Sequence, residues 1–304
     1  MTCSWRFGKL LLLAVLFPLS HSPSNIAWAQ TAGASLKKPS RATCNRAQFR
    51  VVVDVGHTAE VPGATSARGV PEYEYNLRLA KQIGQKLTGA GFTKTEVLVT
   101  SGRSMKGLTE RVTRANSIAP DLFLSVHHDS VPEYFLERWE YAGAQHHFSD
   151  RFKGHSLFIS YENSQPQASL HFAQLLGDEL KARGLQYASH YTQPFMGHRR
   201  RDLLDAEAGV YRFDALIVLR KTQMPAVLLE AGSIVNREEE LAMGSPERQS
   251  IISAAVAKAV DIYCSSRSPG LAAQPLAEDP RDGQLVRQKV QPTTAATQQA
   301  HPVR

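Results

Sequence analysis

The chain has 304 residues, 42% of them hydrophobic, and carries a formal charge of +7. This composition supplies a hydrophobic core and excludes wholesale disorder. The charge is uneven, because residues 1–29 carry +2, 30–47 carry +4 and 265–304 carry +2, whereas residues 48–264 hold 24 basic against 25 acidic side chains. A nucleic-acid groove needs its positive charge on the folded segment, so this distribution argues against nucleic acid as a partner.

Residues 1–29 have the three parts of a secretory signal peptide. A start with two basic residues precedes an apolar run over 10–19, and a small-x-small cleavage site ends at Ala29. The apolar run is shorter than the ~20 residues that span a bilayer, although a retained N-terminal anchor is the alternative. We predict cleavage after Ala29 and a periplasmic or secreted product, with no transmembrane segment after the signal is removed.

The remaining chain divides into three predicted parts. Residues 30–47 are rich in Ala, Ser, Lys and Pro and are predicted to be a basic linker. Residues 265–304 are rich in Pro, Gln, Ala and Thr, lack hydrophobic periodicity, and are predicted to be a disordered tail. The segment between them, residues 48–264, is predicted to fold as one domain.

Short β-branched runs alternate with helical patterns along this domain. The predicted strands are 49–55, 96–100, 122–127, 156–160, 215–219 and 226–230, and the predicted helices are 75–90, 108–118, 167–183 and 251–263. Such alternation is typical of an α/β fold, here a mostly parallel twisted sheet with helices on both faces. The functional site of such a fold lies beyond the carboxyl ends of its strands.

Three predicted strands end in side chains that bind metals or transfer protons. His57 follows the first strand, His127 ends the third, and Glu230 ends the strand that begins at Ala226. Glu72 lies between the first strand and the next helix. Two imidazoles and a carboxylate suit a single zinc ion with an open fourth position, and a further carboxylate beside the metal is suited to act as a general base.

Each of these residues also has a plainer interpretation. A lone histidine after a strand is usually a capping or loop residue, and Glu72 and Glu74 are acids of the kind that a helix dipole favours in its first turn. Glu230 is harder to explain in this way, because a carboxylate that follows four apolar residues needs a partner. Found together, the four side chains favour a functional site.

Cys44 and Cys264 are the only cysteines left after the signal is removed. An even count in an oxidising compartment favours a disulfide, and the two residues flank the first predicted strand and the last predicted helix. A bond between them would tie the ends of the domain together. Two free thiols are the alternative.

Several ordered motifs of the domain resemble those of the zinc-dependent N-acetylmuramoyl-L-alanine amidases, the family of the bacterial division amidases. The resemblance covers about residues 51–263. The motifs are Asp54-Val55-Gly56-His57, Gly63-Ala64, Gly69-Val70-Pro71-Glu72, Asn76-Leu77 with Leu79-Ala80, Leu108, Arg111, Ala115-Asn116, Ser125-Val126-His127, Val218-Leu219-Arg220, Pro225-Ala226-Val227-Leu228-Leu229-Glu230, Gly232 and Asn236.

The resemblance implies that His57, Glu72 and His127 bind one zinc ion and that Glu230 is the catalytic carboxylate. It also implies the reaction, hydrolysis of the amide that joins the lactyl group of N-acetylmuramic acid to L-alanine in peptidoglycan. Residues 48–264 would then be a zinc amidase domain that remodels the cell wall, with daughter-cell separation as one expected role. Peptidoglycan is the expected partner, and an activator protein is left open.

The family pattern also ranks two candidate ligands. Glu72 is preferred to Glu74 because the family's ligand lies four residues before the Asn of its Asn-Leu pair, here Asn76. The chain departs from the pattern beside the proposed ligands at four positions, Val55, Thr58, His128 and Asp129. None of these is a proposed ligand, so the departures concern specificity more than metal binding.

Arg220 and six further histidines are the remaining candidate functional residues of the domain. Arg220 is expected to end a strand, where it meets either the peptide carboxylates of the substrate or a structural salt-bridge partner. Six more histidines have spacings that fit no known ligand set, and we interpret them as surface or local hydrogen-bonding residues: His146, His147, His155, His171, His190 and His198.

The sequence of residues 131–154 indicates its secondary structure and role less clearly than the rest of the domain. The stretch 132–141 is predicted to form a short amphipathic helix that carries Glu133, Glu137 and Glu140. Some division amidases plug their zinc site with a glutamate from a helix, so this segment is a candidate lid. The link after the next strand is too short for a long plug.

Two other functions are compatible with the same residues. One is a catalytically silent peptidoglycan-binding or activator module of the same fold, although inactive relatives usually lack part of the His/Glu/His/Glu set. The other is a zinc peptidase that acts on the stem peptide. Both alternatives differ from an amidase in the products they would leave from peptidoglycan.

Overall fold

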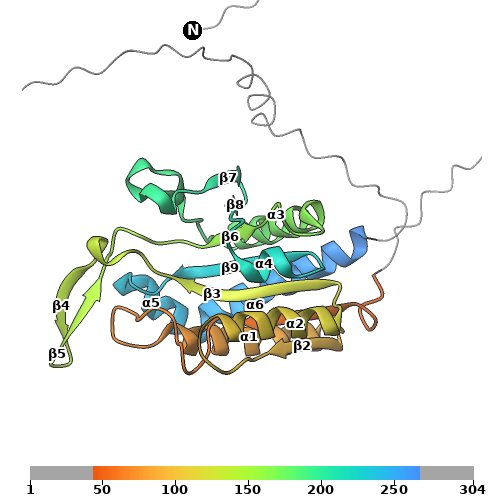
Figure 1. Cartoon of the computed structure of the whole chain (residues 1–304), viewed down its shortest axis with the longest axis horizontal. Coiled ribbons are helices and arrows are strands. Elements are labelled where there is room, and N and C mark those ends of the chain that lie inside the picture. Colours follow the sequence, from red (N-terminus) through yellow and green to blue (C-terminus); the bar gives the residue numbers. More distant parts are fainter. Residues whose placement is uncertain (1–43, 268–304) are drawn as a thin grey trace, which may run out of the picture. The chain divides into compact units, whose positions relative to one another are not determined.

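A seven-stranded sheet forms the centre of the protein in the computed structural model, which describes residues 44–267 (Figure 1). The strands lie in the order β2-β1-β3-β9-β6-β8-β7. Their bounds are β1 (Arg50–Val55), β2 (Lys94–Leu98), β3 (Leu122–Asp129), β6 (Ser156–Ile159), β7 (Asp202–Asp205), β8 (Val210–Arg212) and β9 (Ala226–Ser233). Strands β2, β1, β3 and β9 are parallel, β6 runs antiparallel to β9 but parallel to β8, and β7 is antiparallel to β8. The predicted mostly parallel sheet is confirmed.

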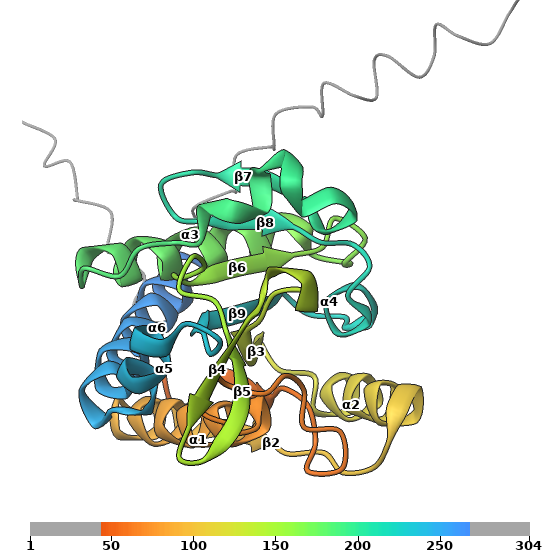
Figure 2. The same cartoon turned by 90° about the vertical axis from the view of Figure 1, so that its left-hand side faces the viewer.

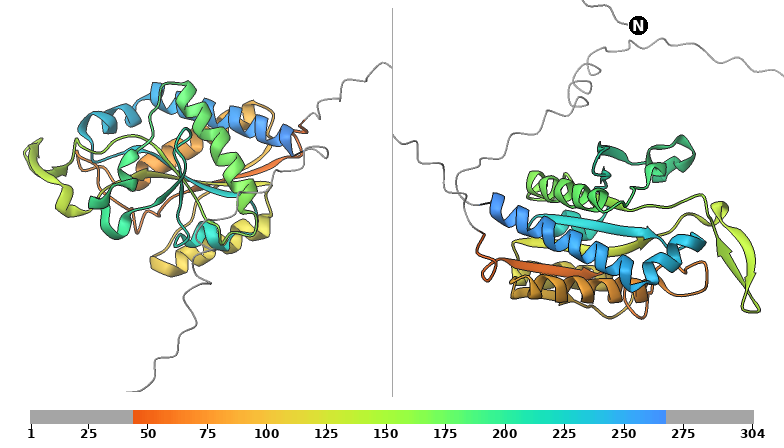
Figure 3. Two further views of the ribbon diagram at one scale, coloured as in Figure 1. Left: turned by 90° about the horizontal axis from the view of Figure 1, so that it is seen from above. Right: turned by 180° about the vertical axis from the view of Figure 1, so that it is seen from behind.

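Helices cover both faces of this sheet. One face is covered by α1 (Glu72–Gly89), α3 (Pro166–Ala182) and α6 (Pro246–Ser266), and the other by α2 (Ser104–Ile118) and α4 (Ile217–Lys221) (Figure 2). Figure 3 shows α6 between α1 and α3. Alternation along β1 explains the two layers, because Val51 and Val53 pack into the first and Val52 into the second.

The segment predicted as an amphipathic helix, 132–141, is not an α-helix. It contains a 3₁₀ turn, η1 (Glu133–Phe135), and the strand β4 (Glu137–Tyr141), which pairs antiparallel with β5 (Ala144–Phe148). Ala142 and Gly143 join the two strands with positive φ angles of 51° and 76°. Two-residue hairpin turns with positive φ at both central residues match the twist of the strands they join. The turn at Ala142 and Gly143 therefore favours a hairpin over a helix in this segment. The hairpin projects beyond the sheet (Figure 1).

The predicted strand 215–219 is also wrong, because α4 (Ile217–Lys221) occupies most of it. The backbone N–H groups of Leu219 and Arg220 donate to the carbonyl of Leu216 at 3.1 and 3.0 Å, as in a helical turn. A short apolar run is compatible with either a buried strand or a buried helical turn, and periodicity alone cannot separate them.

Several short elements were not predicted from the sequence. They are β7, β8, α5 (Arg237–Gly244) and the 3₁₀ segments η2 (Ser189–Thr192) and η3 (Pro194–Arg199). Each is too short to show a hydrophobic period. Within residues 44–267 no helix combines the length and apolarity needed to cross a membrane. The predicted signal peptide, most of the linker and nearly all of the tail lie outside the described residues.

A disulfide joins Cys44 and Cys264, whose Cα atoms are 5.2 Å apart. It ties the segment before β1 to the last turns of α6, as the sequence predicted. An ion pair between Arg46 and Asp261 at 2.7 Å lies close to it in the chain and connects the same two segments. The two ends of the domain are therefore held together by one covalent and one ionic contact.

Replacement of both Cys44 and Cys264 by serine should lower the free energy of unfolding by up to about 5 kcal/mol, because the bond restricts a very long loop in the unfolded chain. Urea denaturation of the wild type with and without reductant measures the effect. The double variant is the control, since reductant should leave its midpoint unchanged. A wild-type midpoint that does not move under full reduction would contradict the prediction.

Two histidines that were interpreted as surface or locally hydrogen-bonded residues are buried. His155 is 3% exposed and His190 is 9% exposed. Burial, which disfavours the charged imidazolium, lowers the pKa of each to about 4. His155 lies in the core between the β6 strand and the segment around Gln186, whose carbonyl accepts its backbone N–H at 3.0 Å. Both residues therefore disfavour the folded state in acid.

His155 should make the protein sensitive to mild acid. Its pKa is about 4 in the folded state and about 6.5 in an unfolded chain, so the unfolded chain binds the extra proton first as the pH falls. The stability this residue contributes is present above pH 6.5 and is lost towards pH 4, by about 3 kcal/mol. In urea denaturation, His155→Gln should lose that much less stability than the wild type between pH 7 and 4. The exposed His198→Gln is the control, and equal slopes for both variants would contradict the prediction.

Candidate metal and catalytic site

Three side chains meet beyond the carboxyl ends of β1 and β3. His57 lies two residues after β1, His127 lies in β3, and Glu72 is the first residue of α1, which begins three residues earlier than predicted. Glu72 Oε2 is 3.0 Å from His57 Nε2, and Glu72 Oε1 is 3.0 Å from His127 Nδ1. One ligand atom from each residue lies within 4.8 Å of the others. The structure thus brings together the three predicted ligands.

No other group of three such residues has this geometry in the part of the chain that the structure describes. The six remaining histidines are not part of such a group among residues 44–267. His128 lies in the same strand as His127, but its ring faces Asn76.

Glu72 is the better placed of the two candidate glutamates. It is 4% exposed, whereas Glu74 is exposed to solvent. Asn76 Nδ2 donates to Glu72 Oε1 at 3.1 Å, and the backbone N–H of Ala64 donates to Oε2 at 3.1 Å. Burial opposes ionisation, but hydrogen bonds from the two histidines hold the pKa of Glu72 well below its usual value. The carboxylate is therefore charged and able to bind a cation.

Two glycines allow the close approach of these side chains. A Cβ on Gly56 would lie 2.5 Å from the His127 ring. Gly63 has a φ of +80°, and a Cβ there would lie 2.6 Å from the His57 ring. His57 itself has a φ of +66°, a left-handed conformation that a residue with a side chain rarely adopts. Such backbone strain persists only where the surrounding contacts impose it.

A buried ion pair supports the strained turn. Arg111 Nε is 3.0 Å from Asp54 Oδ1, and the two side chains are 3% and 0% exposed. Arg111 Nη2 donates to the His57 carbonyl at 2.7 Å and to Thr100 Oγ1 at 2.9 Å, while Ser125 Oγ donates to Asp54 Oδ2 at 2.6 Å. Arg111 thus connects α2 to the residue that follows β1. Asp54 inside an apolar strand was the sequence signal for this network.

Arg111→Ala should lower the free energy of unfolding by about 3–5 kcal/mol, because it leaves the Asp54 carboxyl buried without its cation. Urea denaturation measures the change. Arg114→Ala is the matched control on the same helix, since its exposed pair with Glu96, 3.8 Å apart, should contribute less than about 1 kcal/mol. Equal losses in the two variants would contradict the role of the buried pair.

His128 supports the site without joining it. The side chain is 2% exposed, and its Nδ1 lies 2.7 Å from Asn76 Oδ1. Burial lowers its pKa to about 3, so the ring is neutral. Its ring packs against Tyr75 with centroids 5.5 Å apart. Because Asn76 also donates to Glu72, His128 fixes the amide that orients a ligand carboxylate.

Glu230 lies on β9 directly beside the site, where its register partner on β3 is His127. Its Oε2 atom is buried and has no hydrogen-bond partner among the described residues. Burial first, then the charges of Asp129 and Glu72, raise the pKa of Glu230 well above its usual value, while Arg199 opposes them. A carboxyl with a buried, unpaired oxygen and a raised pKa is a candidate for proton transfer.

Asp129 is a second acid next to Glu230. It is 5% exposed, and Tyr191 OH donates to its Oδ2 at 2.7 Å. His190 Nε2 lies 3.8 Å from the same oxygen. Burial raises the pKa of Asp129 to about 6. The family pattern commonly has Asn at this position. The sequence did not indicate that Asp129 would contact Tyr191 in η2.

An apolar cavity opens beside the two histidines. Its volume is about 390 Å³, and His57 and His127 contribute to its wall. Much of the remaining lining is apolar and comes from Leu108, Leu216, Ile217, Val218 and Leu228. The misassigned strand 215–219 therefore builds this wall through α4 and the residues before it.

Arg220 lies on α4 and does not end a strand. Its Nη1 is 3.5 Å from Glu162 Oε2, and both side chains are partly exposed. This contact matches the salt bridge that the sequence left open as the alternative to substrate binding. Arg220 does not line the apolar cavity.

The candidate lid also differs from expectation. Glu133, Glu137 and Glu140 are all exposed, so none of them plugs the histidine pair. The hairpin instead packs on the loop before α1, where Trp139 Nε1 donates to the Ala67 carbonyl at 2.8 Å. The Arg68 guanidinium carbon lies 5.3 Å from the Trp139 ring centroid.

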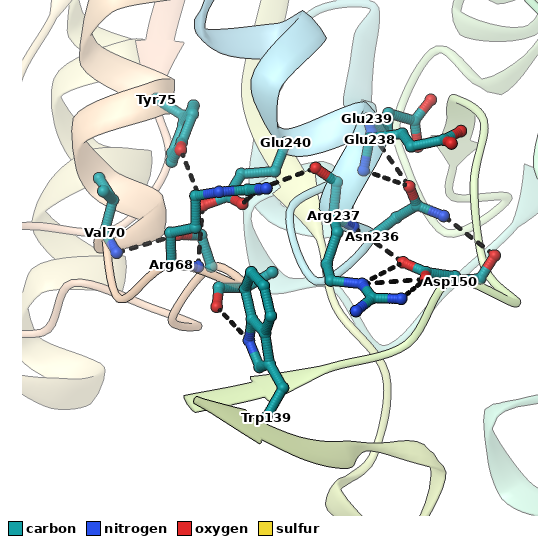
Figure 4. A network of polar contacts seen from close by, with 12 residues as sticks. Arg68, Val70, Tyr75, Trp139, Asp150, Asn236, Arg237, Glu238, Glu239 and Glu240 are labelled. Carbon is teal, nitrogen blue, oxygen red and sulfur yellow. Dashed lines mark hydrogen bonds and ion pairs between the residues drawn. The ribbon is translucent and has the colours of Figure 1, made fainter. Parts of the chain in front are cut away.

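A polar network behind this loop includes α5 (Figure 4). Glu240 is 2% exposed, accepts the backbone N–H of Arg68 at 3.0 Å and forms an ion pair with the Arg68 side chain. Arg237 pairs with Asp150 beside it. The network anchors the residues that precede the candidate ligand Glu72. In the sequence, only the Asn236 motif indicated this network. Asn236 caps α5 by accepting two backbone N–H groups.

Comparisons with known proteins bear on this geometry. The profile of the N-acetylmuramoyl-L-alanine amidase family matches residues 51–261. The chain is 27% identical over 214 residues to the uncharacterised protein YqiI of Bacillus subtilis, across 70% of this chain and 84% of that protein. It is 24% identical over 225 residues to the N-acetylmuramoyl-L-alanine amidase AmiA of Escherichia coli, across 70% of this chain and 75% of AmiA.

Solved structures share the fold. The amidase Ami1 of Mycobacterium smegmatis aligns with a TM-score of 0.56 at 21% identity, over 73% of this chain and 100% of that chain. The catalytic domain of the amidase CwlV from Bacillus (Paenibacillus) polymyxa var. colistinus aligns with a TM-score of 0.51 at 25% identity, over 71% of this chain and 97% of that chain.

Proposed function

The chain belongs to the N-acetylmuramoyl-L-alanine amidase family, and we propose that it uses zinc to hydrolyse the amide between the lactyl group of N-acetylmuramic acid and L-alanine in peptidoglycan. The observation that carries the zinc proposal is the group formed by His57, Glu72 and His127, with the unpaired carboxyl of Glu230 on the neighbouring strand. The group supplies both a cation site and a proton carrier at one edge of the sheet.

The donor set fits zinc. Two imidazole nitrogens and one carboxylate oxygen form a His₂Glu set, and the ionised Glu72 supplies negative charge between the two rings. Gly56 and Gly63 leave the space that the rings need. When bound there, zinc would lower the pKa of a water molecule and polarise the amide carbonyl. Asn76 donates to the Glu72 carboxylate, and Arg111 donates to the His57 carbonyl. These two hydrogen bonds hold the proposed ligands in place.

Glu230 is the proposed general base. Its carboxyl takes a proton from the attacking water and then delivers it to the leaving nitrogen of L-alanine. A pKa raised by burial and by neighbouring acids makes the Glu230 carboxylate a stronger base than an exposed glutamate. The apolar cavity beside the histidines gives the substrate room next to the site.

The cellular setting is part of the same proposal. We take residues 48–264 as the catalytic domain and residues 1–29 as a signal that directs it to the periplasm or the exterior. The Cys44–Cys264 disulfide is compatible with an oxidising compartment. Cell-wall remodelling, including daughter-cell separation, is the proposed role. One structural neighbour, CwlD of Clostridioides difficile, was solved in complex with the GerS lipoprotein, so a protein partner of this chain is worth testing.

The roles of ligand and base can be separated by substitution. Glu230→Gln should retain zinc but lose about 10²–10⁴-fold in activity, because proton transfer is removed while the ligands remain. His57→Ala should lose both zinc and activity. Metal analysis of the purified variants and release of stem peptides from purified sacculi measure the two properties. Glu74→Gln is the matched control for Glu72→Gln, since Glu74 is exposed.

Two results would contradict these assignments. Wild-type activity in Glu230→Gln would remove Glu230 as the base, and loss of zinc in Glu74→Gln with retention in Glu72→Gln would exchange the ligands. Product analysis separates the reaction classes as well. Free stem peptides with intact glycan indicate an amidase, shortened stems indicate a peptidase, and unchanged sacculi indicate binding alone.

A further inference from the structure

Arginines and aromatic rings form a surface beside the candidate site, built from η1, η3 and the segment before β6. We call it the arginine–aromatic rim and define it by Tyr134, Phe135, Arg151, Phe195 and Arg199. Tyr134 and Phe195 are 68% and 38% exposed. The Phe135 and Phe195 centroids are 5.7 Å apart, and the Arg151 guanidinium carbon lies 4.0 Å from the Phe195 centroid.

The rim is continuous with the catalytic site. Arg199 Nη2 donates to the carbonyl of Ser130, the residue after Asp129, at 3.1 Å. Asp129 follows the candidate ligand His127 by two residues in β3, so this contact places Arg199 near the strand end that carries the site. A second connection runs through His190, whose ring lies 5.0 Å from that of Phe152 and 3.8 Å, through Nε2, from Asp129 Oδ2.

The rim arginines lack acidic partners. Among residues 44–267, no carboxylate lies within ion-pair distance of Arg151, Arg199 or the adjacent Arg200. Arg68 and Arg237, near the hairpin, each pair with a carboxylate. Arg151 and Arg199, with no carboxylate within ion-pair distance, are able to pair with an anion.

We propose that the arginine–aromatic rim binds the free carboxylates of the stem peptide, on the leaving-group side of the scissile amide; this rests on the proposed function. The glycan strand of peptidoglycan has no free carboxylate at an intact lactyl amide, whereas the stem peptide does. Guanidinium groups recognise carboxylates in a bidentate manner, and exposed rings give the peptide an apolar face to lie on. Arg220, the arginine that the sequence singled out, already faces Glu162.

A matched pair of substrates tests the proposal. The first is a disaccharide tripeptide whose second residue is D-glutamate with a free α-carboxylate, and the second carries D-isoglutamine there. The wild type should cleave the acid with a kcat/KM about tenfold or more above that of the amide. Arg199→Gln and Arg151→Gln should lower kcat/KM for the acid by a similar factor, mainly through KM, and should lower that for the amide by much less.

Two variants control the comparison. Arg199→Lys keeps the charge but not the bidentate geometry, so it should restore part of the preference for the acid. Arg114→Gln makes the same charge change on α2 and should leave both substrates unaffected. Zinc content of all variants should match the wild type, because none of the substituted side chains is a candidate ligand.

The outcomes distinguish this proposal from the proposed function. Equal cleavage of acid and amide by the wild type, or an equal loss on both substrates in the arginine variants, would overturn the role of the rim while amidase activity stands. Cleavage of neither substrate by a zinc-loaded wild type would overturn the amidase proposal itself. A lower kcat with an unchanged KM in Arg199→Gln would assign Arg199 to the electrostatics of Glu230 and reject peptide binding.

Discussion

The register of three parallel strands is the constraint on which the candidate site depends. Val55 pairs with Val126, and His127 pairs with Glu230. The carboxyl ends of β1, β3 and β9 therefore lie close together at one edge of the sheet. Side chains far apart in the sequence therefore meet at one edge. A shift of one residue in either register would turn the polar side chains to the opposite face of the sheet. The apolar runs that precede them fix the register, because both faces of these strands are buried.

The carboxyl groups of Asp54, Glu72 and Glu230 at this edge differ in their partners, and the partners distinguish supporting residues from the proposed proton carrier. Asp54 pairs with Arg111, and Glu72 lies between two imidazoles. Glu230 has an oxygen without any partner among the described residues. A buried polar group left unpaired costs free energy, so it is retained where function needs it. The same reasoning, applied at the surface, distinguishes unpaired Arg199 from the paired Arg220.

Local pattern predicted some parts of the fold well and others poorly, for physical reasons. The buried strands are long apolar runs and were found within a few residues, whereas 215–219 was too short to separate a strand from a helical turn. In the segment that contains the hairpin, the positive φ angles at Ala142 and Gly143 outweighed an apparent helical spacing. The burial of His155 depends on segments distant in the sequence, so its local pattern gave no sign of it.

The sequence by itself predicted the α/β class from alternating strand and helix patterns and the Cys44–Cys264 pair from the even cysteine count. It gave His57, Glu72, His127 and Glu230 as candidates, because each belongs to a short local motif. Only the tertiary structure decided which glutamate of the first helical turn faces the histidines, that Arg111 supports the His57 carbonyl and that Asp129 meets Tyr191. It also placed Arg199 beside Glu230. These contacts join segments separated by many residues, and only the packing of strands and helices sets the distances between them.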